Sequence, residues 1–158
     1  MNAFRFSVSD LDGLYQFTQT FDQAIASVRS ATLECQRDLY SPDCFAPRFN
    51  GFRVYARNPQ CGRTMYLWCG LLYDPSSRMG LMIEMDQFSN QDVYRDAYDR
   101  LAPGDLYEIK KNEKHIKLFM PDARWSALCG LPSPADQLKA LIEYTTSCME
   151  TFARAIQR

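Results

Sequence analysis

The stretch from Met65 to Asp86 constrains the fold of this chain more than any other part of it. Its sequence is MYLWCGLLYDPSSRMGLMIEMD, in which apolar runs at 66–73 and 81–86 flank a segment rich in proline, serine and glycine. Turn residues between two apolar runs of strand length predict a β-hairpin. We expect this hairpin at the centre of an antiparallel sheet.

Both faces of the first strand of this hairpin are apolar. Side chains alternate along a strand, which places Leu67, Cys69 and Leu71 on one face and Tyr66, Trp68 and Leu72 on the other. A strand of this kind is buried on both sides, so we expect both faces of the sheet to be covered.

The flanking sequence predicts further strands and three helices. We expect strands at 3–8 and 52–57, a second hairpin at 105–111 and 114–120, and an irregular segment at 121–132. Helices are expected at 10–39, capped by Ser9 with Asp12; at about 90–101, capped by Ser89; and from Ser133 nearly to the C-terminus. The second hairpin should bury Tyr107, Ile109, Ile116 and Leu118.

The predicted order of elements is β-α-β-β-β-α-β-β-α. We therefore predict an α+β fold, a single antiparallel β-sheet of five to six strands with long N-terminal and C-terminal helices. The 158 residues are expected to form one domain, 1–158, whose size allows a core without a metal or disulfide.

Charge and cysteine content indicate a cytoplasmic protein with no strong electrostatic partner. The chain has 18 basic and 19 acidic side chains, which nearly cancel. No apolar run approaches the roughly 20 residues that span a membrane, and the first ten residues lack a signal-peptide pattern. None of the six cysteines forms a C-x-x-C pair. Cys35, Cys69 and Cys148 fall on apolar faces, and Cys44 and Cys61 fall in loops.

Motifs of the common catalysts are absent from the sequence, so we predict no catalytic residue, metal or cofactor. There is no phosphate loop, H-E-x-x-H or G-x-S-x-G motif. The only histidine, His115, is expected in solvent among lysines. One arrangement fits a metal-dependent nuclease: Asp86 on one strand, with Glu108 and Lys110 alternating on another.

Basic residues suggest a patch for nucleic acid or another partner, although the balanced charge makes nucleic acid the less favoured one. Lysines cluster on the second hairpin, and arginines alternate along 52–57 with stacking rings nearby. The residues concerned are Lys110, Lys111, Lys114, Lys117, Arg53 and Arg57.

Aromatic residues offer an alternative site, a pocket for a small organic ligand. Its expected lining residues are Tyr66, Trp68, Tyr94 and Tyr98, with Glu84 in mid-strand as a buried acid. The topology is similar to that of tandem βαββ (GyrI-like) domains, and that resemblance implies ligand binding between two halves with a buried acid.

A second resemblance covers about residues 65–156. The segments LWCGLLYD at 67–74, GLMI at 80–83, YEI at 107–109 and IKLFMP at 116–121 carry it. They resemble the α+β accessory domain found with some bacterial PD-(D/E)XK-type proteins, which implies a noncatalytic recognition role.

Three functional hypotheses follow. The first is a noncatalytic protein-interaction or regulatory module of the bacterial cytoplasm, an inhibitor or immunity-type factor, whose long first helix could also form a homodimer. The second is a small-molecule-binding domain with the aromatic pocket. The third is the metal-dependent nuclease-like enzyme.

Overall fold

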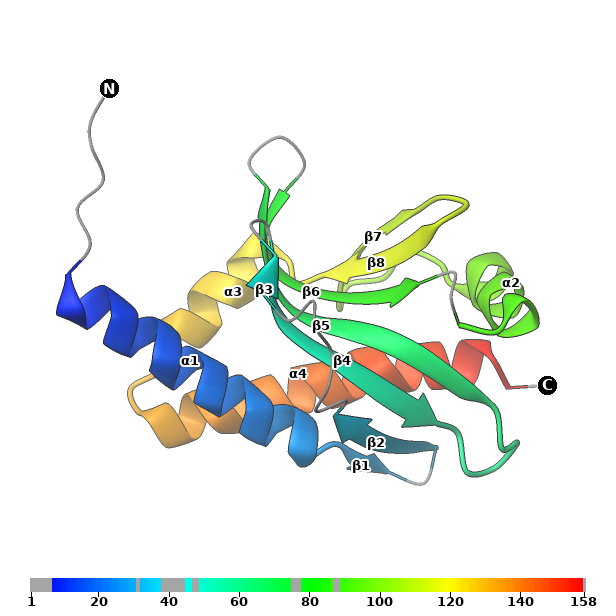
Figure 1. Cartoon of the computed structure of the whole chain (residues 1–158), viewed down its shortest axis with the longest axis horizontal. Helices are drawn as coiled ribbons and strands as arrows, with labels where there is room; N and C mark the ends of the chain where they lie inside the picture. The colour runs from blue at the N-terminus through cyan, green and yellow to red at the C-terminus, as the bar shows by residue number, and fades with distance from the viewer. Residues whose placement is uncertain are drawn as a thin grey trace.

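A computed structural model describes residues 7–30, 32–37, 45–46, 49–74, 78–86 and 89–157 of the chain. It has an antiparallel sheet with helices packed against one of its faces (Figure 1). The predicted α+β class and single antiparallel sheet are therefore confirmed.

The described strands form one sheet in the order β1-β2-β4-β5-β6-β8-β7, with β3 paired to β4 outside this path. Each pairing is antiparallel. The prediction of five to six strands was too low, because the short strands at 29–30, 33–37 and 45–46 were missed. The bounds are β1 Arg29–Ser30, β2 Leu33–Arg37, β3 Phe45–Ala46, β4 Phe49–Arg57, β5 Thr64–Asp74, β6 Arg78–Asp86, β7 Glu108–Lys111 and β8 His115–Phe119.

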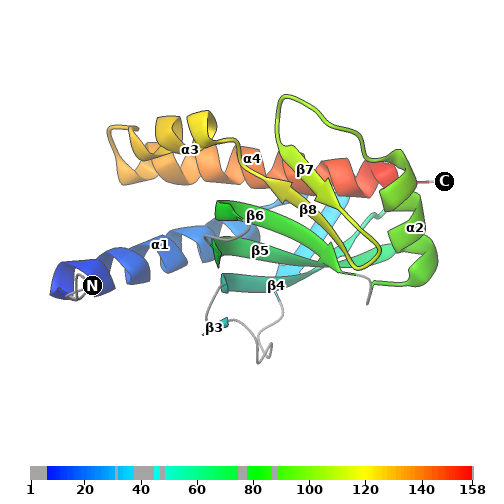
Figure 2. The same cartoon turned by 90° about the horizontal axis from the view of Figure 1, so that it is seen from above.

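Four helices accompany the sheet in the described ranges. They are α1 Val8–Ala26, α2 Gln91–Arg100, α3 Asp122–Cys129 and α4 Pro134–Ala155. Helix α4 begins as predicted, with the Ser133 hydroxyl accepting from the Asp136 amide and proline in the first turn. Figure 2 shows α4 running along the sheet, with α2 near its C-terminal end.

One hydrophobic core lies between the sheet and helices α1 and α4. The inward side chains of β4, β5, β6 and β8 alternate with outward ones, and we call this covered side the inner face. Its buried residues include Val54, Leu67, Cys69, Ile83, Met85, Ile116 and Leu118. Phe21 and Ile25 from α1 and Met149 and Phe152 from α4 pack against them. The predicted buried face of the second hairpin is confirmed, with Ile109 partly buried at the margin of the core.

The N-terminal helix is shorter than predicted and begins earlier. Ser7 is its cap: the Ser7 hydroxyl accepts from the Asp10 amide at 3.2 Å, and the Asp10 carboxylate accepts from the Ser7 amide at 2.9 Å. The predicted cap, Ser9 with Asp12, is therefore wrong, and the cap with the same three-residue spacing lies two residues earlier. Ser7 and Val8 are therefore the cap and first residue of a helix rather than part of a strand, and positions 3–6 of the predicted strand lie outside the described residues.

The predicted continuation of this helix to residue 39 is also wrong. The helix ends at Ala26, and 29–30 and 33–37 form strands instead. Val28 and Cys35 have helical spacing, but β2 gains a full ladder of pairs along the edge of β4, from Glu34↔Arg57 to Arg37↔Val54. Tertiary pairing overrides a weak local preference here. Leu39, the last predicted helical position, lies outside the described residues.

Two further local predictions are corrected by side-chain hydrogen bonds and helix geometry. Asn90 rather than Ser89 caps α2, accepting from the Asp92 amide. The Ser89 hydroxyl instead accepts from the Tyr66 amide and donates to the Tyr66 carbonyl at the edge of β5. The segment 121–132, expected to be irregular, contains α3.

Both faces were expected to be covered, but the helices of the described part of the chain cover only one. On the other face Leu72, Met82 and Phe119 form a second, smaller buried cluster. The side chains of Tyr66 and Trp68 are half-buried, and Tyr55 is 36% exposed. These side chains point away from α1 and α4, on what we call the outer face. They shield one another there, and this arrangement leaves a surface with aromatic and charged groups.

Gly51 on β4 gives a direct test of this packing. A Cβ atom there would overlap the Cys69 carbonyl oxygen and would lie 2.7 Å from Cζ of Phe49. We expect Gly51→Ala to lower the free energy of unfolding by about 3 kcal/mol, because backbone must move.

Gly13 in α1 is the matched control. Nothing lies within 4 Å of its Cβ position. Gly13→Ala should raise the unfolding free energy by about 0.5–1 kcal/mol through helix propensity. Urea unfolding of both variants is the measurement, and equal midpoints would contradict the packing described for β4 and β5.

Candidate functional site

The outer face brings charged and aromatic side chains from five strands into rows. Residues directly opposite each other in an antiparallel pair lie on the same face. The register places Arg53 opposite Trp68, Trp68 opposite Glu84, Glu84 opposite Lys117 and Lys117 opposite Lys110. In a neighbouring row Tyr55 is opposite Tyr66, and Asp86 is opposite His115.

Glu84 is the centre of this face. It is only 7% exposed, although it belongs to the face that the helices leave uncovered. Its Oε1 atom lies 2.7 Å from Nδ1 of His115, and its Oε2 atom lies 3.3 Å from Nζ of Lys117. A buried carboxylate is costly unless it is hydrogen-bonded and paired. These two partners, both from β8, therefore hold the carboxylate in place.

A pocket of about 300 Å³ lies against the Glu84 carboxylate. Its walls are mostly apolar and aromatic, and its polar groups lie together at one end. The lining residues are Phe49, Trp68, Leu72, Met82, Glu84, Asp86 and Lys117. An apolar cavity with a few converging polar groups is the usual form of a small-molecule site.

Two glycines and one aromatic pair shape the pocket. Gly51 and Gly70 face each other on β4 and β5, so neither strand carries a side chain there. The ring of Phe49 folds back over Gly51. It meets the Trp68 ring edge to face, with centroids 5.8 Å apart. Edge-to-face packing fixes the orientation of both rings.

The predicted aromatic site is brought together only in part. Trp68 and Glu84 line the pocket. Tyr66 lies beside it, under the Arg53 guanidinium, whose Cζ is 4.8 Å from the ring centroid. Tyr94 and Tyr98 belong to α2, with ring centroids 6.4 Å apart, and neither is among the lining residues.

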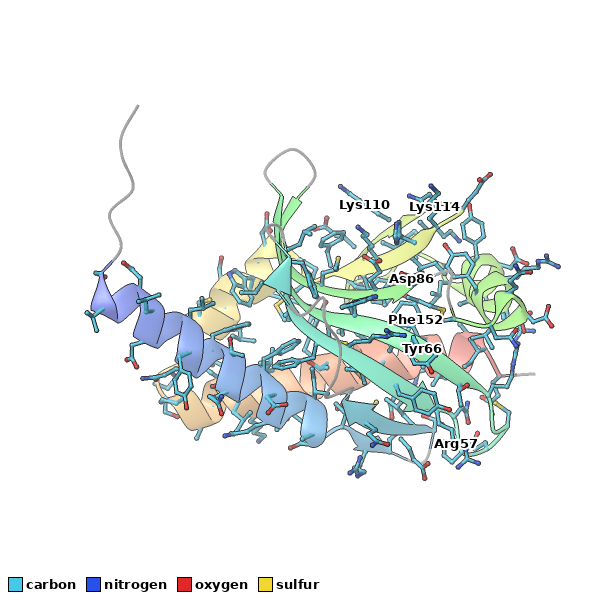
Figure 3. All side chains as sticks on the ribbon, viewed as in Figure 1. Arg57, Tyr66, Asp86, Lys110, Lys114 and Phe152 are labelled. Atoms are coloured by element: carbon cyan, nitrogen blue, oxygen red, sulfur yellow. The ribbon has the colours of Figure 1, made fainter. Side chains whose placement is uncertain are left out.

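The predicted basic patch is divided between distant parts of the sheet. Arg57 on β4 and the β7–β8 hairpin carrying Lys110 and Lys114 lie at opposite sides of the sheet (Figure 3). Arg57 lies 3.6 Å from the Glu34 carboxylate, and Arg53 lies over Tyr66 and Trp68.

The lysines of the hairpin also have different surroundings. Lys111 donates to the carbonyls of Tyr98 and Leu101 at the end of α2. Lys117 is paired with Glu84. Lys110 lies 5.8 Å from the Phe119 ring centroid. Lys110 and Lys117 are directly opposite each other on β7 and β8, so these two residues of the predicted patch share a face of the sheet.

The predicted nuclease arrangement of Asp86, Glu108 and Lys110 does not converge. Asp86 is opposite His115, whereas Glu108 is opposite Phe119, four residues further along β8. Strand β8 also lies between the strands of the two acids. Strand geometry therefore puts the two Cα atoms roughly 16 Å apart.

His115 is the site residue that the sequence reasoning missed. It was expected in solvent, but its ring contacts Glu84. One ligand atom from each of Glu84, Asp86 and His115 lies within 4.8 Å of the others, a set of types that metal ions accept. The alternation of Glu84 and Asp86 could be read from the sequence, whereas the register of β8 against β6 could not.

Buried thiols supply no nucleophile to the site. Cys35, Cys69 and Cys148 are free and buried, as their predicted apolar positions implied. Burial raises the pKa of Cys35 and of Cys148 to about 12, and it raises the pKa of Cys69 well above its ordinary value. These thiols stay protonated at neutral pH and behave as small apolar side chains.

Comparisons with known protein families, with curated proteins and with solved structures each return no match for this chain. The two family resemblances therefore stay predictions. No helix in the described ranges has both the length and the apolar character needed to span a membrane.

Tyr94 gives a pH-dependent prediction. Burial raises the pKa of its hydroxyl to about 12, with smaller contributions in the same direction from Tyr98, Asp86 and Glu84. The protonated hydroxyl donates to the Asn112 carbonyl at 2.7 Å. The unfolded chain loses this proton near pH 10, so the folded state holds more protons between pH 10 and 12. The free energy of unfolding should therefore fall as pH rises through this window.

The variant Tyr94→Phe tests this assignment. It should lose about 1 kcal/mol at neutral pH, the contribution of one hydrogen bond, and show a smaller loss of stability between pH 10 and 12. Burial also raises the pKa of Tyr107. Tyr107 therefore accounts for part of the alkaline loss of stability that remains in Tyr94→Phe. Urea unfolding across pH is the measurement; an unchanged alkaline slope in Tyr94→Phe would contradict the assignment.

Proposed function

We propose that this protein binds a small organic cation in the pocket beside Glu84. The observation that carries the proposal is a 7%-exposed carboxylate in the wall of a mostly apolar and aromatic pocket. A buried carboxylate in the wall of an apolar pocket offers a ligand a charged contact that is shielded from water.

The chemistry of the lining indicates the class of ligand. Phe49, Trp68, Leu72 and Met82 suit a planar apolar body. Each carboxylate oxygen of Glu84 has one partner on β8, and an ionised carboxylate offers about four acceptor positions in all. Acceptor positions therefore remain for an N–H group of the ligand. An aromatic amine or amidine matches both parts of the pocket.

The electrostatics favour a cationic head group over an anionic one. Glu84 and Asp86 contribute two carboxylates to the pocket, and Lys117 contributes one ammonium. Charge-assisted hydrogen bonds to a carboxylate are about twice as strong as neutral ones. An anionic ligand would meet repulsion at the same position.

Benzamidine is a suitable probe because it combines a planar ring with an amidinium that matches a carboxylate. We expect it to perturb backbone amide resonances of β5 and β6 in EDTA-treated protein, and benzoate not to do so. Glu84→Gln should weaken benzamidine binding by about tenfold or more. Trp68→Leu should weaken it through lost ring contact.

Glu113→Gln is the matched control for this experiment. Glu113 is exposed at the turn between β7 and β8 and outside the pocket. Its loss changes the net charge by the same amount as Glu84→Gln, so benzamidine affinity should stay unchanged. Equal binding of benzamidine to the wild type and both pocket variants, or stronger binding of benzoate, would contradict the proposal.

A second candidate function, protein interaction, is favoured by the exposed part of α1. Val8, Leu11, Leu14 and Tyr15 are 84%, 58%, 42% and 63% exposed. They occupy the first two turns, while Phe21 and Ile25 near the other end of the helix are buried. Exposed apolar clusters of this kind are typical of binding surfaces.

The charges of α1 indicate what sort of partner fits this surface. The helix contains Asp10, Asp12 and Asp22 and no lysine or arginine. We infer that its partner is a different protein with an apolar groove and a basic rim, because a second copy of α1 would place aspartates near aspartates.

Leu11 is the residue whose replacement separates binding from folding. Leu11→Ser should change the free energy of unfolding by no more than about 0.5 kcal/mol, since the side chain is exposed. The partner is first captured by cross-linking to a photoreactive residue at position 15 and is then purified. Leu11→Ser should lower the affinity for this partner at least tenfold.

Val28→Ser is the control, since Val28 is fully buried and should affect stability instead. Light scattering should show a monomer at micromolar concentration. A dimer that Leu11→Ser dissociates would replace the separate partner with a second copy and would contradict this inference.

A further inference from the structure

We propose that Glu84, Asp86 and His115 form a binding site for a divalent first-row transition-metal ion, of which zinc is the test case. Glu84 and Asp86 alternate on β6, and His115 on β8 is directly opposite Asp86. Two alternate residues on one strand and one on its neighbour present three side chains on one face. This inference does not rest on the organic ligand proposed above.

The distances between the ligand atoms are close to those of a coordinated ion. One atom from each residue lies within 4.8 Å of the other two, and Nδ1 of His115 is 2.7 Å from Oε1 of Glu84. Zinc–nitrogen and zinc–oxygen bonds of about 2.0–2.2 Å in a tetrahedron put neighbouring ligand atoms about 3.3 Å apart. The closest pair must therefore open by about 0.6 Å, and the widest must close by at most about 1.5 Å.

The ligand types select the class of metal. One imidazole and two carboxylates suit zinc, manganese or iron, whereas calcium and magnesium prefer sites built from oxygen alone. Two carboxylates also balance the charge of a divalent ion.

Lys117 contacts the Glu84 carboxylate without being a ligand of the metal ion. Its Nζ atom is 3.3 Å from Oε2 of Glu84, which leaves Oε1 directed toward His115. Hydrogen bonds from such outer groups orient metal-binding carboxylates.

The site would retain an open coordination position. Three protein ligands leave one position of a tetrahedral ion for water or another donor. Glu84 and Asp86 also line the pocket, so that position is accessible from it. Zinc and an organic cation would compete for Glu84, and saturating zinc should therefore weaken benzamidine binding.

A plain ion pair between Glu84 and His115 is the alternative explanation of the short contact. That pair needs no third residue, whereas a metal site needs Asp86. The variant Asp86→Asn separates the two explanations, because it leaves both members of the pair in place and removes one charged ligand.

The single histidine makes the experiment specific. His115 is the only histidine in the chain, so its imidazole nitrogen resonances report on this site alone. Zinc bound to the partly exposed Cys61 or the exposed Cys129 would not perturb these resonances directly. We expect one zinc ion per chain by calorimetry, with a large shift of the His115 nitrogens at the same stoichiometry.

Four variants complete the test. Asp86→Asn and Glu84→Gln should each weaken the binding that His115 reports by at least about tenfold. Glu113→Gln is the charge-matched control and should bind zinc as the wild type does. Trp68→Leu should retain zinc affinity while losing benzamidine affinity. Circular dichroism of each variant checks that the fold is preserved.

Two results would overturn the metal site. One is no shift of the His115 nitrogens at saturating zinc, and the other is zinc binding at His115 that Asp86→Asn leaves unchanged. If benzamidine still binds in either case, the organic-cation site stands and the metal site alone is rejected.

Discussion

The one-sided covering of the sheet is the constraint on which the rest of this structure depends. Helices α1 and α4 bury the inner residues of β4, β5, β6 and β8 in a single core. The outer residues of the same strands have no helix of the described part against them. These side chains shield one another instead. Phe49 packs on Trp68, and Arg53 lies over Tyr66. His115 and Lys117 hold Glu84. The candidate site therefore consists of side chains that pack against one another on the face that no described helix covers.

Local patterns predicted the parts of the fold that local chemistry decides. Alternation along 66–73 assigned Leu67 and Cys69 to one face and Trp68 to the other, and Ser133 with Asp136 marked the start of α4. The same patterns failed where a distant partner decides the outcome. Val28 and Cys35 kept helical spacing, yet pairing with β4 turned that segment into strands. The uncovered face was missed because an aromatic side chain such as Trp68 suits a core and a half-buried surface equally well.

The candidate site was predictable in the same uneven way. Glu84 and Trp68 were expected in a pocket, and both line it. His115 was expected in solvent, because its neighbours in the sequence are lysines. Its position beside Glu84 depends on the register of β8 against β6, which a pattern with a period of two residues does not specify. The register likewise separates Asp86 from Glu108, which had seemed suited to a shared metal. Asp86 instead lies near His115.

The central claim is that the outer face of β5 is accessible to solvent at Tyr66 and Trp68 while its inner face is sealed. Hydroxyl-radical footprinting of the native protein tests this claim most directly. Met65 and Trp68 lie three residues apart on β5, on opposite faces, with Met65 fully buried. The account predicts that Trp68 and Tyr66 are oxidised readily while Met65 is protected, although a methionine sulfur is intrinsically reactive. Protection of Trp68 to the same degree as Met65 would contradict the account, because it would mean that another layer covers the outer face.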